Sequence, residues 1–177
     1  MPSKLPRSLA VFPLALLLAN WSGPTLAAQV NLEKWHLIRI PDPMARRAAV
    51  DALETASARF ADADCRKILT DFEDGNGHSL ADQLSSLDVD VQRYLTMVTF
   101  IDDSRHRTCA SGVLAITAPG SRVVRVCAAE LSRINAQKPE YVVASLIHEI
   151  LHTLGLGENP PSSSEITARV VARCGPK

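Results

Sequence analysis

The sequence lacks a net charge: its 177 residues include 19 lysines and arginines and 19 aspartates and glutamates. Nucleic-acid-binding domains usually carry a basic excess, so this balance argues against a nucleic-acid partner. The chain also lacks internal repeats, low-complexity segments and a basic amphipathic stripe suited to a membrane surface. It has no C-x-x-C pair, which disfavours a cysteine-based metal site.

Residues 1–28 have the three parts of a Sec signal peptide. Lys4 and Arg7 form a positive end, an apolar stretch follows at 9–19, and Thr-Leu-Ala-Ala at 25–28 resembles the small-residue cleavage region. This apolar stretch is too short to span a bilayer comfortably. Cleavage after residue 28 would leave 29–177 as one domain, large enough to bury a core. We therefore expect a secreted or periplasmic monomer without stable membrane insertion; an N-terminal membrane anchor is the alternative.

Four cysteines remain after the expected cleavage, namely Cys65, Cys109, Cys127 and Cys174. In an exported chain an even number of cysteines usually forms disulfides, and four cysteines allow three pairings. Cys109 and Cys127 flank a predicted β-hairpin, which favours the pair Cys109–Cys127 and leaves Cys65 to join Cys174.

The remaining pattern predicts an α+β fold. Pro41 ends the first β-rich stretch, and Asp42-Pro43 resembles a helix N-cap followed by a first-turn proline. The first half is expected to form a strand at 35–40, a helix from about 44 to 60 with helical spacing continuing to 72, a turn at 74–77 and a short helix after a capping box at 79–82. The second half is expected to form a strand at 97–101 that is buried on both faces, then a hairpin of 112–117 with 122–126. A linker through 138, a helix from 139 and a final helix at 165–171 complete the chain.

Residues 148–152 read His-Glu-Ile-Leu-His, the H-E-x-x-H pattern that places two imidazoles and a carboxylate around one zinc ion. Residues four apart share one face of a helix, so His148 and His152 can both reach a single metal. Glu149 is rotated about 100° from His148, which suits a base acting on water rather than a ligand.

The helix that carries this pattern is well specified. Pro139 and Glu140 are favourable first-turn residues, and no breaker follows before Gly155. Apolar residues surround the motif on nearly every side, which predicts a buried helix. Because buried histidine and glutamate side chains need partners, a metal ion would satisfy them together.

The longer stretch 148–158 resembles the extended signature of the metzincin metalloproteases, H-E-x-x-H-x-x-G-x-x-H, with Glu158 where the third histidine would stand. Gly155 allows a sharp turn that would bring Glu158 to the metal as its third ligand. Metzincins also have a methionine-containing turn after the site, whereas this chain has methionine only at positions 1, 44 and 97. In the thermolysin-like zincins the third ligand is a glutamate on the following helix, here Glu165. Glu165 is therefore the alternative ligand, although Ser162-x-x-Glu165 also reads as a capping box.

The order of elements resembles the zincin fold: a small twisted mixed sheet backed by a long helix, an active-site helix and a C-terminal helix. In that family an antiparallel edge strand binds extended peptide through main-chain hydrogen bonds. By order along the chain, that strand is formed by Val113, Leu114, Ala115, Ile116 and Thr117.

These observations predict a secreted, Zn²⁺-dependent metallopeptidase acting on a peptide or protein substrate. Zinc bound by His148, His152 and Glu158 would activate water, with Glu149 as the general base. A cell-wall amidase would use the same residues. The alternative from another class is a non-catalytic, disulfide-stapled binding or structural domain whose zinc site is structural or vestigial.

Overall fold

The computed structural model describes residues 33–176, so the expected signal segment 1–28 lies outside the described residues. The fold is α+β, with a small, open, mixed sheet. The described elements are β1 (Ile38–Arg39), α2 (Pro43–Phe60), α3 (Ala63–Arg66), α4 (Ile68–Asp71), α5 (Leu80–Ser86), α6 (Val91–Leu95), β2 (Thr99–Asp102), the 3₁₀ helix η1 (Arg107–Ser111), β3 (Ala115–Ile116), β4 (Val123–Val126), α7 (Ala128–Asn135), α8 (Pro139–Thr153) and α9 (Ser163–Cys174).

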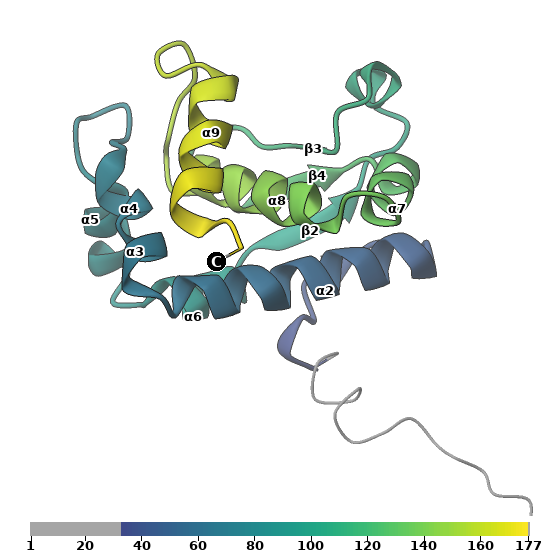
Figure 1. The fold of residues 1–177 in the computed structure, drawn as a ribbon, viewed down its shortest axis with the longest axis horizontal. Helices are drawn as coiled ribbons and strands as arrows, with labels where there is room; N and C mark the ends of the chain where they lie inside the picture. The colour runs from purple at the N-terminus through teal and green to yellow at the C-terminus, as the bar shows by residue number, and fades with distance from the viewer. Residues whose placement is uncertain (1–32, 177) are drawn as a thin grey trace, which may run out of the picture.

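The sheet has the strand order β1-β2-β4-β3, in which β1, β2 and β4 are parallel and β3 pairs antiparallel with β4. The long helix α2 packs against α7 and α8, α8 contacts β3 and β4, and α9 packs on α8 (Figure 1). The H-E-x-x-H motif therefore lies on a central helix, with the sheet edge on one side and α9 on another.

Local signals set the ends of several helices as predicted. Asp42 caps α2 by accepting a hydrogen bond from the Ala45 amide, with Pro43 in the first turn. Ser79 and Ser162 open α5 and α9 with complete capping boxes. The final helix extends beyond the predicted 165–171 because its apolar side, including Ile166 and Val170, is buried against the rest of the domain.

The boundaries predicted for several other elements were wrong. The first strand is only Ile38–Arg39, because residues 35–37 form a turn. The strand predicted at 97–101 is Thr99–Asp102, and Phe100 alone is fully buried, so the expected burial on both faces is not found. Helix α6 was missed, and α7 occupies most of the predicted linker through 138. Both helices are short, so packing decides their conformation more than propensity does.

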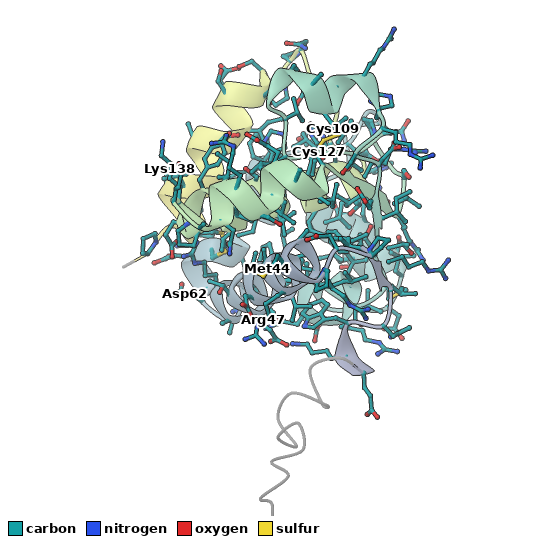
Figure 2. The ribbon with its side chains drawn as sticks, turned by 90° about the vertical axis from the view of Figure 1, so that its right-hand side faces the viewer. Met44, Arg47, Asp62, Cys109, Cys127 and Lys138 are labelled. Atoms are coloured by element: carbon teal, nitrogen blue, oxygen red, sulfur yellow. A yellow bond between two sulfur atoms is a disulfide. The ribbon has the colours of Figure 1, made fainter. Side chains whose placement is uncertain are left out.

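Both disulfides are present, and they join Cys65 to Cys174 and Cys109 to Cys127. The first ties α3 to the end of α9, where Asp71 also binds the guanidinium of Arg173 through two hydrogen bonds. The second connects η1 to the end of β4 (Figure 2). Two disulfides indicate an oxidising compartment. Within residues 33–176, no helix combines the length and apolarity that a membrane span requires.

The two disulfides should differ in their effect on stability. They close loops of 109 and 18 residues, for which chain-entropy models give about 4–5 and about 3 kcal/mol. We expect the double variant Cys65→Ala/Cys174→Ala to lose more free energy of unfolding than Cys109→Ala/Cys127→Ala, measured by chemical denaturation. Equal losses, or the reverse order, would contradict this prediction.

Candidate metal centre

Helix α8 holds the two motif histidines inside the protein. Pro139 begins the helix, and Glu140 in its first turn pairs with Arg59 of α2. The sequence prediction of a buried helix is confirmed, because its apolar residues from Val142 to Leu151 lie in the core. His148 and His152 are only 5% and 4% exposed. Their one-turn spacing on a rigid helix places both imidazoles on the same face.

Each imidazole is held in orientation by a hydrogen-bond partner at its ring nitrogen Nδ1. The carbonyl oxygen of Leu156 accepts a hydrogen bond from Nδ1 of His152 at 2.7 Å. A carbonyl can only accept, so Nδ1 of His152 is the donor, and its other ring nitrogen, Nε2, faces His148 and Glu158. His148 Nδ1 lies 2.9 Å from the hydroxyl of Thr167 on α9. Such outer hydrogen bonds are typical of metal-ligating histidines.

The chain turns back sharply after α8, as Gly155 predicted. Gly155 has φ +108°, a conformation that suits glycine, and a Cβ there would lie 3.0 Å from the Cβ of Asp74. A β-bridge between Asp74 and Leu156 holds the returning chain. This turn delivers both the Leu156 carbonyl and, two residues later, Glu158.

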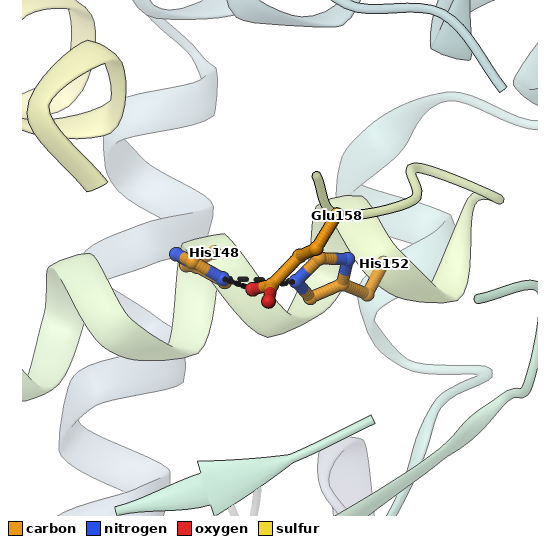
Figure 3. Close-up of side chains that lie close together, drawn as sticks. All are labelled: His148, His152 and Glu158. Atoms are coloured by element: carbon orange, nitrogen blue, oxygen red, sulfur yellow. Dashed lines mark hydrogen bonds and ion pairs between the residues drawn. The ribbon is translucent and has the colours of Figure 1, made fainter. Parts of the chain in front are cut away.

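Figure 3 shows the result: His148, His152 and Glu158 converge on one point. The two Nε2 atoms are 2.9 Å apart, and Glu158 Oε1 lies 3.4 Å from Nε2 of His148 and 3.3 Å from that of His152. Tetrahedral zinc with bonds of about 2.0–2.1 Å would have ligand atoms about 3.3 Å apart, which matches both distances to Glu158, while the two Nε2 atoms would move apart slightly.

The electrostatics of the group also fit a cation. Burial, with a smaller effect from the neighbouring His152, lowers the pKa of His148 to about 4, so its ring is neutral at pH 7. If its Nδ1 donates to Thr167, its Nε2 presents a lone pair. That lone pair, Nε2 of His152 and a carboxylate oxygen of Glu158 face one another in a largely buried place. A cation shared among them, either a proton on a histidine or a metal ion, would stabilise this arrangement.

Of the two glutamates considered as third ligand, only Glu158 belongs to this group. The carboxylate of Glu165 accepts hydrogen bonds from the backbone N–H and the hydroxyl of Ser162. These contacts lower the pKa of Glu165 and hold it at the start of α9. Its helix-capping role, which the sequence already indicated, accounts for its position.

Glu149 lies beside the group without belonging to it. Burial raises the pKa of its carboxyl, while the nearby hydroxyl of Thr117 has a smaller, opposite effect. Neither Glu149 Oε2 nor Thr117 Oγ1 has a hydrogen-bond partner within 3.5 Å among the described residues, although both atoms are buried. Buried polar atoms without partners are costly and often mark functional sites.

A cleft of about 580 Å³ contains Glu149 and the three ligand residues. All five residues of the predicted edge strand, Val113 to Thr117, line its opposite wall, although only Ala115–Ile116 are regular strand. Because β3 ends the strand order, one of its edges is free of the sheet. The loop after it is fixed to α8, since the Gly120 amide donates to the His152 carbonyl at 2.8 Å.

Sequence reasoning missed Thr167 and the Leu156 carbonyl. Thr167 lies 19 residues after His148, and no local pattern links the two. Every residue has a backbone carbonyl, so no sequence pattern marks that of Leu156. The turn at Gly155 brings this carbonyl to His152. Sequence analysis also left Tyr141 without a function, whereas the structure places it in the wall of the cleft.

No protein-family model, curated protein or solved structure matches this chain, so the function of the site has to be inferred from its own geometry.

Proposed function

We propose that this protein is a secreted or periplasmic zinc metallopeptidase of the zincin type, with His148, His152 and Glu158 as the zinc ligands. The observation that carries the proposal is the convergence of three buried or half-buried acceptor atoms beside a glutamate with an unpaired carboxylate oxygen. Two histidines and one glutamate form a ligand set used in catalytic zinc sites. Three protein ligands leave one of the four positions of tetrahedral zinc for water or substrate.

When bound, zinc would lower the pKa of water and polarise a substrate carbonyl. Glu149 is the general base: its free Oε2 accepts a proton from the attacking water and returns it to the leaving amine. Burial raises its pKa, which makes the protonated form easier to reach during turnover. Thr167 and the Leu156 carbonyl keep the two imidazoles in position throughout.

The free edge of β3 supports a peptide as the substrate. An extended peptide can pair with such an edge through main-chain hydrogen bonds, which places a carbonyl group in the cleft opposite α8. The competing structural-zinc function needs a fourth protein ligand. Among residues 33–176, the ligand group contains His148, His152 and Glu158 only, which favours the catalytic reading.

Metal binding provides the first test. The folded, oxidised protein should bind about one zinc ion per chain, measured by elemental analysis after dialysis. His152→Ala should lose the ion, and Glu158→Gln should weaken binding by about a hundredfold or more, because a charged ligand is removed. Glu165→Gln is the matched control and should bind zinc as the wild type does. A folded wild type that binds no added zinc would disprove the proposal.

Catalysis is tested by Glu149→Gln. This variant should bind zinc normally but lose turnover of peptide substrates by about a thousandfold, because the proton acceptor is gone. Its free energy of unfolding should equal or exceed that of the wild type, since a neutral amide replaces a carboxyl in a poorly solvated place. Activity equal to that of the wild type would rule out Glu149 as the base.

A further inference from the structure

Tyr141 is exposed to solvent in the wall of the cleft that contains the three ligand residues. In the described part of the chain the exposed large hydrophobic residues are Met44, Leu87, Tyr141 and Val171, and Tyr141 is 51% exposed. It alone of these lines the cleft that contains the metal ligands. Its neighbours along this wall are Ser145, one turn later on α8, and then His148.

The two walls of the cleft indicate the direction in which an extended peptide would run along it. The wall formed by 113–117 runs the same way as α8, because the chain enters β3 from the side of η1 and α7, where α8 begins (Figure 1), and the Gly120 amide after β3 binds the His152 carbonyl at the end of α8. A peptide that pairs antiparallel with β3 therefore runs from the His152 end to the Tyr141 end. Residues on the C-terminal side of the scissile bond would lie over Tyr141.

Helix geometry gives the position of that contact. Seven residues of helix separate Tyr141 from His148, which is about 10 Å at 1.5 Å per residue. An extended peptide advances about 3.3 Å per residue, so the same span takes about three residues. The charged side chains that line the cleft, Glu149 and Glu158, are both acidic and both lie at the metal end. An acidic substrate side chain near Tyr141 would therefore find no basic partner in the cleft.

We propose that Tyr141 forms the floor of a subsite for an uncharged aromatic or aliphatic side chain, three residues C-terminal to the scissile bond. The subsite rests on the proposed peptidase function. Thr108 and Ser111 of η1 line the same cleft, and the Cys109–Cys127 disulfide fixes η1 to the sheet. Burying a side chain against the tyrosine ring supplies the binding energy.

The kinetic test uses the zinc-loaded enzyme and blocked peptides that differ only at the third residue after the bond cleaved by the wild type. With phenylalanine there, Tyr141→Ala should lower kcat/KM by about tenfold, through KM. With glycine there, or with the peptide shortened before that residue, Tyr141→Ala should equal the wild type. Tyr141→Phe should retain the preference, and Met44→Ala, which removes an exposed side chain of α2 away from the cleft, should have no effect. An equal effect of Tyr141→Ala on all peptides would overturn the subsite.

A binding experiment separates this inference from the proposed function. The chain contains two tyrosines, of which Tyr94 is buried. In protein with isotope-labelled tyrosine rings, the blocked phenylalanine peptide should shift the ring NMR signals of Tyr141 in zinc-loaded Glu149→Gln and leave those of Tyr94 unchanged. Shifts without any cleavage by the wild type would support the subsite and disprove the peptidase. Cleavage or binding that leaves the Tyr141 signals unmoved would disprove the subsite alone, and neither binding nor cleavage would disprove both.

Discussion

Two imidazole nitrogens and a carboxylate oxygen lie within 3.4 Å of one another at the end of α8, and this convergence is the constraint on which the rest of the site depends. Each of these atoms can accept a hydrogen bond or bind a cation, and burial leaves little water to solvate them. A metal ion bound among them would offset this loss of solvation. Zinc binding would therefore stabilise the folded protein as well as supply its chemistry, since the unfolded chain has no preformed site.

The surrounding structure holds these atoms together by contacts from distant parts of the chain. Thr167 orients one imidazole from α9, and the Leu156 carbonyl orients the other from the turn after Gly155. The disulfide between Cys65 and Cys174 fixes the far end of α9 to α3. A helix that carries a partner of His148 is thus held at one end by a covalent bond and packed on α8 along its length. Metal affinity and stability should accordingly be coupled.

The cleft also departs from ordinary packing, since Glu149 and Thr117 keep buried polar atoms without partners. Stable cores keep such atoms few, and of the four in residues 33–176 two belong to this one cleft. Glu149 and Glu158 line the cleft beside the two histidines, and Tyr141 lines it from two helical turns earlier on α8. The proposed chemistry and the proposed substrate selection would thus take place in different parts of one cleft, and α8 contributes residues to both.

The sequence by itself determined the elements whose signals are local. The Asp42-Pro43 cap, both capping boxes, the turn at Gly155 and the spacing of His148 and His152 depend on residues within one or two helical turns, so short-range geometry is enough to specify them. The tertiary structure decided the rest. It placed Glu158, and not Glu165, beside the two histidines, supplied Thr167 as a partner of His148 and raised the pKa of Glu149 by burial. These features depend on which segments pack together in space, because distances, desolvation and hydrogen-bond partners between remote residues are set only when the core forms.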